Sequence, residues 1–175
     1  HALLQVETVA AGGGDRVACR PGCSSCCRVN VSVLAPEAAL IALHPAAAAV
    51  REGVRETALK VRWMEDPERI RRGIACPFLD AGGNCSVYPV RPLLCRSVTS
   101  TDAEACREAF ATYDEEGGMV EVDLLQKFLY DQAFVALGEA LAAGGEGRSV
   151  ELCAAVDLFI RDPQLPFTPG FRFPR

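Results

Sequence analysis

Four cysteines within nine residues, from Cys19 to Cys27, constrain this chain more than any other feature of its sequence. A buried cysteine packs as a small hydrophobic side chain and needs no cysteine neighbours. Here the residues between the cysteines include Pro21, Gly22 and Ser24, which are turn formers. A turn lets the backbone fold around a soft metal ion and direct several sulfur atoms at it. The block therefore predicts a thiolate metal site.

A second block contributes three more thiols, Cys76, Cys85 and Cys95. The segment from Asp80 to Asn84 contains two glycines and predicts a hairpin-like turn that brings Cys76 near Cys85. Pro92 predicts the start of a helical turn that carries Cys95. We expect the rest of the chain to be a helical frame that brings the two blocks together.

The charge balance excludes some classes of partner. The 175 residues carry a net charge of −5 and a pI of about 5.1. This argues against a general nucleic-acid binder and against a polybasic membrane anchor. No apolar run approaches the roughly 20 residues that span a bilayer. We therefore expect no nucleic acid, no membrane and a cytoplasmic location, although His1 leaves a lost leader open. Sixteen of the 18 basic residues are arginine, which indicates a GC-rich bacterial genome.

Two explanations compete for the nine cysteines. A disulfide-stabilised secreted domain would favour an even count, a leader and a small core. This chain has an odd count, no visible leader and long amphipathic helices. Adjacent cysteines such as Cys26 and Cys27 bridge each other only with backbone strain. Metal binding is favoured, with the disulfide scaffold kept as an alternative.

The patterns of the chain predict a mainly α fold: a small helical domain with a cysteine-rich metal-binding loop region and a short hairpin. We expect one domain over residues 1–175, with a cysteine-rich core at about 17–110, a helical part at about 119–161 and a proline-rich tail at 162–175. Residues 2–18 predict a short helix or strand and a turn, residues 29–33 a short strand, and residues 115–118 a turn. The predicted helices cover residues 36–44, 46–65, 66–72, 101–113 and 120–142, and a last helix capped by Ser149.

Eight thiols lie in or just after the two blocks and are the candidate metal ligands: Cys19, Cys23, Cys26, Cys27, Cys76, Cys85, Cys95 and Cys106. One tetrahedral ion needs four, so we expect two ions or one polynuclear cluster shared between the blocks. Cys106 fits either a core thiol or the last ligand. Cys153 lies in an apolar helix pattern and is expected to be a core thiol. His44, beside Pro45 at a helix end, is expected to be a surface or capping residue.

Several other side chains lie near the thiols in sequence. Arg91 and Arg96 are expected to offset thiolate charge and to hydrogen-bond around the sulfurs, whereas Arg20 and Arg28 fit that role and a solvated surface equally well. The aromatic residues Phe78, Tyr88 and Trp63 are expected in the core rather than in a pocket.

These residues together match a known pattern. Its parts are Cys19…Gly22-Cys23-x-x-Cys26-Cys27, Val31-x-Val33, Glu37-Ala38, Cys76-Pro-Phe-Leu79 and Cys85-x-x-Tyr88-x-x-Arg91-Pro92-x-x-Cys95-Arg96. The pattern resembles the YkgJ family of CxxCxxCC proteins, described as zinc- or iron-chelating, over roughly residues 17–110. Cys19 and Cys23 are separated by three residues where the family name implies two. A flagellin lysine methylase carries a similar block, which hints at an iron–sulfur cluster.

The leading hypothesis is a metal-binding protein that chelates zinc, or iron, through clustered thiolates. The alternative is an iron–sulfur enzyme or redox protein, for example one that modifies proteins. Whether the protein is an enzyme, and which substrate or protein partner it has, stays open at this level.

Overall fold

The computed structural model describes residues 17–113, 120–145, 147–168 and 170–173, and helices make up just over half of these described residues. The predictions for residues 2–16 and for the turn at 115–118 lie outside these ranges. The described elements are β1 (Ser32–Val33), α2 (Ala35–Leu43), α3 (Pro45–Ala49), α4 (Arg51–Val61), α5 (Asp66–Arg71), η1 (Tyr88–Val90), α6 (Leu93–Ser97), α7 (Ala103–Ala111), α8 (Leu124–Ala143), β2 (Val150–Glu151), α9 (Leu152–Arg161) and η2 (Leu165–Phe167). The mainly helical fold is confirmed.

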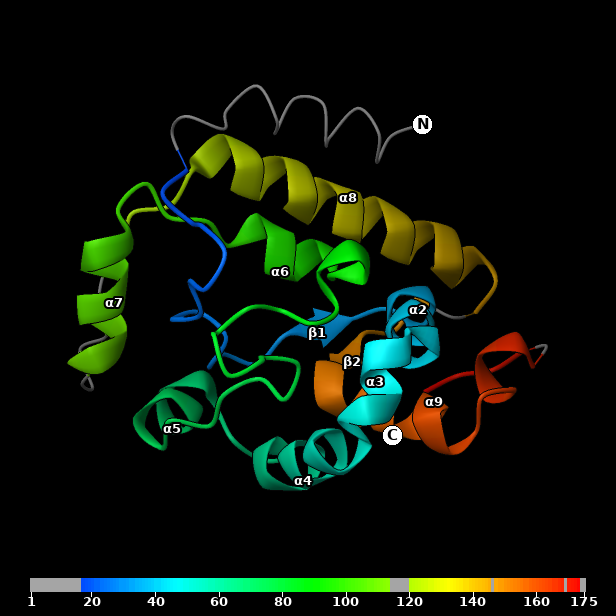
Figure 1. The fold of residues 1–175 in the computed structure, drawn as a ribbon. Helices are drawn as coiled ribbons and strands as arrows, with labels where there is room; N and C mark the ends of the chain where they lie inside the picture. The colour runs from blue at the N-terminus through cyan, green and yellow to red at the C-terminus, as the bar shows by residue number, and fades with distance from the viewer. Residues whose placement is uncertain (1–16, 114–119, 146, 169, 174–175) are drawn as a thin grey trace.

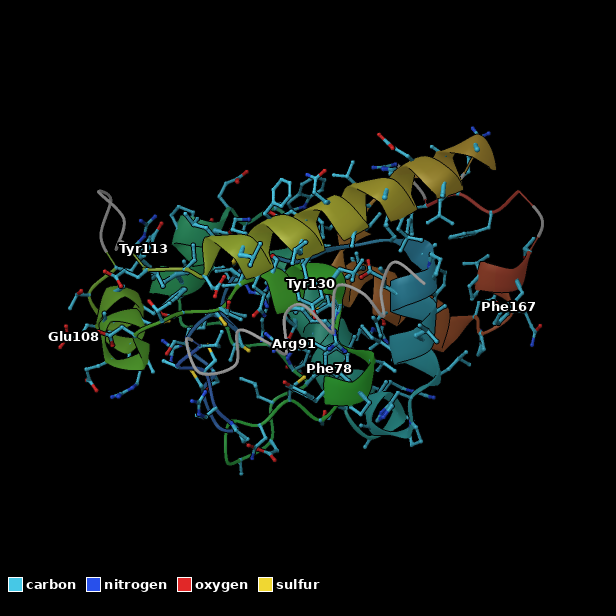
Figure 2. All side chains as sticks on the ribbon, turned by 90° about the horizontal axis from the view of Figure 1, so that it is seen from above. Phe78, Arg91, Glu108, Tyr113, Tyr130 and Phe167 are labelled. Atoms are coloured by element: carbon cyan, nitrogen blue, oxygen red, sulfur yellow. The ribbon has the colours of Figure 1, made fainter. Side chains whose placement is uncertain are left out.

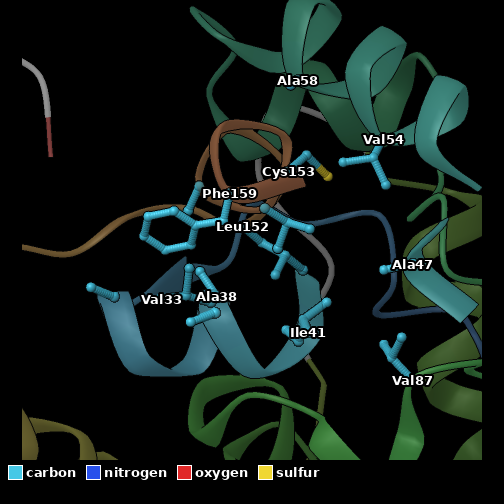
Figure 3. Packing of buried hydrophobic residues seen from close by; sticks show 14 of the residues in the cluster. Val33, Ala38, Ile41, Ala47, Val54, Ala58, Val87, Leu152, Cys153 and Phe159 are labelled. Carbon is cyan, nitrogen blue, oxygen red and sulfur yellow. The ribbon is translucent and has the colours of Figure 1, made fainter. Parts of the chain in front are cut away.

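The core is built around α9. Cys153 and Phe159 on this helix are at most 1% exposed, and Figure 3 shows them between Val54 of α4 on one side and Ile41 of α2 on the other. A strongly apolar face on α9 explains this position, because burying such a face removes it from water. The prediction that Cys153 is a core thiol is confirmed.

The two short strands join distant parts of the chain. β1 pairs with β2 in antiparallel register, Ser32 with Glu151 and Val33 with Val150. The segment that follows the first cysteine block is thereby attached to the start of α9. The prediction that Ser149 caps the last helix was wrong: Glu151 is the cap, and its carboxylate accepts a hydrogen bond of 2.9 Å from the backbone N–H of Ala154.

The single helix predicted over residues 46–65 is two helices. α3 ends at Ala49 and α4 begins at Arg51, with Val50 in a non-helical conformation between them. The prediction for Trp63 was also wrong, because it follows α4 and is 84% exposed, with the Arg62 guanidinium 4.9 Å from its ring. The break redirects the chain so that Val54 and Ala58 face the core around α9.

α8 runs along one side of the molecule and packs on α6, as Figure 1 shows. The side-chain amide of Gln126 donates a hydrogen bond of 2.9 Å to the Arg96 carbonyl and joins the two helices. The long helix was predicted, yet several of its large apolar side chains face outward: Leu124 is 73% exposed and Phe128 60%. None of the described helices combines the length and the apolar character that a bilayer crossing requires.

The C-terminal segment returns over the core. Phe171 and Phe173 are buried, and their rings lie 5.4 and 5.6 Å from the Phe159 ring. The expectation of a tail laid over the core is confirmed, with η2 as a short 3₁₀ turn inside it.

Candidate metal centre

A cavity of about 390 Å³ lies where the two cysteine blocks meet. Seven of the eight candidate thiols line it, namely Cys19, Cys23, Cys26, Cys27, Cys76, Cys85 and Cys95. Cys106 is the exception, since it is buried on α7 and does not line the cavity. Phe78 and Arg91, which also line the cavity, lie toward the middle of the molecule, whereas Phe167 lies at its edge (Figure 2).

The first block folds as consecutive turns. The N–H of Cys23 donates to the Arg20 carbonyl at 2.9 Å, and the N–H of Cys27 donates to the Ser24 carbonyl at 3.0 Å. Gly22 between them has a φ of 86°, in the left-handed region that favours glycine. Because the chain changes direction at each of these turns, several of its thiols can lie on the same side. This agrees with the turns predicted from the sequence.

The second block contains the predicted hairpin turn. Leu79 and Cys85 form an isolated antiparallel bridge, and the N–H of Ser86 donates to the Phe78 carbonyl at 2.8 Å. The Asp80 carboxylate accepts from the N–H groups of Gly82 and Asn84, each at 2.8 Å, and the hydrogen bonds from Asn84 hold the pKa of Asp80 below its usual value. The turn therefore places Cys85 at the cavity beside Cys76.

The two blocks interlock at two points. The N–H of Cys76 donates to the Cys27 carbonyl at 2.7 Å, which joins the blocks through their backbones. The two glycine turns also touch: a Cβ placed on Gly83 would lie 2.9 Å from the Gly22 carbonyl oxygen. The thiols thus face one cavity because the backbone itself connects the blocks.

The segment before α7 holds Cys19 in place through hydrogen bonds. The N–H of Ser100 donates to the Cys19 Sγ at 3.4 Å, and the N–H of Ala18 donates to the Ser100 carbonyl at 2.8 Å. These two hydrogen bonds attach the start of the first cysteine block to the backbone at Ser100. The same segment leads through Asp102, the N-cap of α7, to Cys106.

The adjacent thiols Cys26 and Cys27 divide their roles. The Cys27 thiol donates a hydrogen bond to Cys26, and this bond, with the nearby Arg91 guanidinium, lowers the pKa of Cys26 to about 6 against the cost of burial. The same bond, together with burial, raises the pKa of Cys27. The pair therefore carries a negative charge more readily on Cys26 than on Cys27.

The deeper thiols stay protonated without a metal ion. Burial raises the pKa of Cys76 to about 11, of Cys95 to about 12 and of Cys106 to about 11. Burial, with the neighbouring Cys19, also raises the pKa of Cys23. A metal ion that binds here must displace these protons, so binding becomes tighter as the pH rises.

Electrostatic coupling links the thiols into two overlapping groups, and Cys26 belongs to both. Cys106 is close enough to Cys26, Cys23 and Cys19 for their charges to raise its pKa. Cys95 is coupled in the same way to Cys76, Cys26 and Cys85. Within the described residues, no three Cys, His, Asp or Glu side chains stand at the spacing of ligands to one ion. A cysteine has a single side-chain torsion with three staggered states, so thiols on turns can be re-aimed with little backbone movement.

Arg91 and Arg96 act at different places. Arg91 lines the cavity, donates to the Cys95 carbonyl, and holds its guanidinium carbon 5.7 Å from the centre of the Tyr88 ring. Arg96 donates to the Arg91 carbonyl at 2.8 Å and to the carbonyls of Tyr88 and Pro89, and these three hydrogen bonds hold the backbone of the loop before α6.

The other candidate side chains divide between cavity, surface and helix cap. Arg20 lines the cavity and donates to the Cys19 carbonyl at 2.9 Å, whereas Arg28 does not line it. Phe78 is 1% exposed, as expected of a core residue, and also borders the cavity; Tyr88 borders it too but is 60% exposed, against the expectation for a core residue. The His44 Nδ1 accepts from the Ala46 N–H at 3.3 Å as the N-cap of α3, which confirms its capping role.

Two cavity residues were missed by sequence reasoning. Arg69 is 2% exposed; its guanidinium donates to the Ile74 carbonyl at 3.2 Å and to the Asn30 side chain at 3.0 Å, and lies 3.4 Å from the Glu151 carboxylate. Arg69 and Glu151 both line the cavity. They come from α5 and β2, which are far apart in sequence, so no local motif marks them.

None of the nine cysteines forms a disulfide; all are free thiols. The structure therefore gives the disulfide-scaffold alternative no support.

Free thiols gathered from two interlocked blocks define a cysteine-rich chelating protein. The chain belongs to the CxxCxxCC family, because the family model matches residues 18–116, which is more than half of the chain. The description of this family provisionally names it a zinc- or iron-chelating domain. The expected family is thereby confirmed. No curated protein and no solved structure shows significant similarity to the chain.

Proposed function

We propose that this protein binds zinc through thiolates of the two cysteine blocks and of Cys106, in the reducing environment of the cytoplasm. The observation that carries the proposal is the lining of one cavity by seven of the eight candidate thiols. Thiolates are the ligands that structural zinc sites prefer, and free thiols persist where the compartment is reducing.

Two ions account for eight thiols. The coupling of the thiols favours one ion near Cys19, Cys23 and Cys106, and a second near Cys76, Cys85 and Cys95. Cys26 is coupled to both groups and Cys27 is coupled to Cys26 and Cys76, so this adjacent pair supplies the fourth ligand to each ion. A vicinal pair suits this role because its two side chains leave the backbone in different directions.

The charges of the cavity suit such a site. A zinc ion with four thiolates carries a net charge of −2, so two such sites need positive neighbours. Arg91 and Arg20 line the cavity and supply two positive charges. Hydrogen bonds from outer groups such as the Ser100 N–H further stabilise thiolates.

An iron–sulfur cluster, as part of an enzyme or redox protein, is the second candidate. The observation that favours it is the spacing of the thiols around a wide cavity, where no three of the described donors stand as closely as ligands to one ion. A polynuclear cluster holds its cysteines farther apart than a single ion does, because iron and sulfide atoms lie between them.

Elemental analysis with an absorption spectrum distinguishes these functions, on protein purified without oxygen and without a nickel column. We expect about two zinc ions per chain and no visible absorption, because Zn²⁺ is d¹⁰. Iron with a matching amount of acid-labile sulfide and a broad absorption band near ~400 nm would show that the site holds an iron–sulfur cluster instead of zinc. Protein without either metal under these conditions would contradict both functions.

Single substitutions test the division of ligands. We expect Cys106→Ser and Cys95→Ser each to lose about one of the two ions, because each change leaves one tetrahedral site with three thiolates. Cys153→Ala is the matched control, since Cys153 is fully buried in the α9 core and does not line the cavity. It should keep both ions while losing stability.

A further inference from the structure

Glu37 is an acidic side chain that is only 8% exposed, and both of its carboxylate oxygens accept hydrogen bonds from backbone N–H groups. It lies at the third position of α2, which begins at Ala35. The helix is preceded by Leu34, whose side chain has no polar group to cap the helix. The Glu37 carboxylate takes over part of this task, because its Oε2 accepts a hydrogen bond of 2.9 Å from the Leu34 N–H.

The second oxygen of the same carboxylate reaches another helix. Oε1 accepts a hydrogen bond of 2.8 Å from the N–H of Leu93, the first residue of α6 and 56 positions further along the chain. The first N–H groups of a helix have no partner within that helix, and the residue before α6, Pro92, has no side-chain cap to offer. One buried carboxylate therefore satisfies the starts of both helices.

These two helices connect the cysteine blocks. α2 follows the first block through β1, and α6 carries Cys95 two residues after Leu93. The backbone around Cys95 is held on one side by Glu37 at the Leu93 N–H and on the other by Arg91, which donates to the Cys95 carbonyl.

We propose that Glu37 is a positioning residue of the metal centre: by bridging the starts of α2 and α6, it sets where the Cys95 thiol stands relative to the first cysteine block. The inference rests on the proposed function, because it takes Cys95 as a ligand. A side chain that only capped α2 would need one acceptor oxygen, whereas this one uses both.

Glu37→Gln separates the two roles. Glutamine serves as well as glutamate in capping the start of its own helix, since one acceptor oxygen is enough. Its amide group offers a single acceptor and two donors, so the second N–H would face another donor. Because the bond with Leu34 is local, three positions away in the chain, the amide oxygen should stay there, and the substitution should break the bridge to Leu93 of α6.

The experiment compares wild type, Glu37→Gln and Val54→Ala after equilibration with zinc and a competing chelator. Val54 is fully buried on α4 and does not line the cavity, so its substitution controls for a general loss of stability. Two quantities are measured, the zinc affinity of the chain and the rate at which iodoacetamide alkylates Cys95 in the zinc-loaded protein, read by peptide mass spectrometry. Circular dichroism establishes that each variant is folded.

We expect Glu37→Gln to weaken zinc binding by roughly 10- to 100-fold, as changes in the groups that orient metal ligands do. Alkylation should speed up at Cys95 and stay slow at Cys19 and Cys106. Val54→Ala should lose thermal stability and keep both the affinity and the protection of Cys95.

Different results overturn different claims. Equal affinity and equal protection of Cys95 in wild type and Glu37→Gln would reduce Glu37 to a helix cap. An equal loss of zinc affinity and of Cys95 protection in Val54→Ala would mean that a general loss of stability, and not the broken bridge, weakens the site. A wild-type chain that takes up neither zinc nor iron would refute the proposed function, and the role of Glu37 with it. If Glu37→Gln does not fold, Glu37→Asp replaces it, because a carboxylate on a shorter arm cannot reach both donors; wild-type behaviour of that variant would refute the bridge.

Discussion

Cys26 and Cys27 are neighbours in sequence with opposite acidities, since one donates the hydrogen bond that the other accepts. Arg91, which comes from the second block, lowers the pKa of both thiols, so the difference between them arises from the hydrogen bond that joins them and from burial. We expect the Cys26 thiolate to be the first contact for an incoming metal ion, because the thiolate is the form that binds metal.

In the metal-free protein, we expect iodoacetamide to alkylate Cys26 with a midpoint near pH 6, because its pKa is lowered to about 6 from 9.0 and the anion is populated above that pH. Cys76 and Cys95 should need a pH near 11 and 12. Mass spectrometry of peptides labelled across a pH series measures this. Cys27→Ala should move the Cys26 midpoint upward, because the donor is removed, and an unchanged midpoint in that variant would contradict the assigned roles.

Gly83 determines how closely the two blocks approach. It has a φ of 77°, and an added Cβ would lie 2.9 Å from the Gly22 carbonyl oxygen. Gly73 has a φ of 63° but no atom within 4 Å of the same added Cβ. Both glycines therefore adopt the left-handed backbone conformation, but only Gly83 also lies close to a neighbouring backbone atom.

We expect Gly73→Ala to cost roughly 1–2 kcal/mol of unfolding free energy, the strain of a left-handed residue. Gly83→Ala should cost more and should also lower zinc content, because the clash pushes the blocks apart. Urea unfolding and elemental analysis of the two variants measure these effects. Equal zinc content in both would show that the glycine contact does not hold the site together.

Helices α8 and α9 are both apolar and differ in what covers them. Phe159 on α9 is 1% exposed and contacts two further phenylalanine rings, whereas Phe128 on α8 is 60% exposed. Hydrophobic residues on a helix stabilise the fold only to the extent that packing removes them from water.

The same substitution should therefore have different effects on the two helices. We expect Phe159→Ala to cost about 3–5 kcal/mol of unfolding free energy, the usual cost of emptying a buried aromatic site. Phe128→Ala should stay within about 0.5 kcal/mol of wild type, as exposed positions do. Chemical denaturation of both variants tests this, and a large loss for Phe128→Ala would mean that α8 is covered in solution.

At the scale of the whole molecule, the structure combines a packed helical core around α9 with a region of turns around the cavity. The core is held by apolar contacts among α2, α4 and α9. The cysteine blocks consist mainly of turns, and seven of their thiols are among the side chains that line the cavity between them. Their order should depend on bound metal more than the order of the core does.

Removing the metal with a chelator should thus loosen residues 18–30 and 76–95 and leave α9 protected. Amide hydrogen exchange with and without zinc measures this segment by segment. We expect faster exchange in the two blocks, at the Cys76 N–H among others, and little change in α9. Uniform loss of protection along the chain would show that the metal supports the whole fold equally.

The sequence alone determined the features that depend on neighbouring residues. The turns of the first block, the hairpin at Asp80, the start of α2 next to Pro36 and the start of α7 after its N-cap Asp102 follow from prolines, glycines and capping side chains at short range. The cysteine spacing also indicated the family, because such spacing is local information.

Only the tertiary structure decided which distant groups meet. The pairing of β1 with β2, the break at Val50 and the exposed face of α8 depend on what each segment packs against, which no local pattern records. The same is true at the candidate site: Arg69 meets Glu151 across 82 positions, and Glu37 meets Leu93 across 56. Buried polar groups require partners, but folding chooses which partner arrives, because the choice depends on the packing of the whole chain.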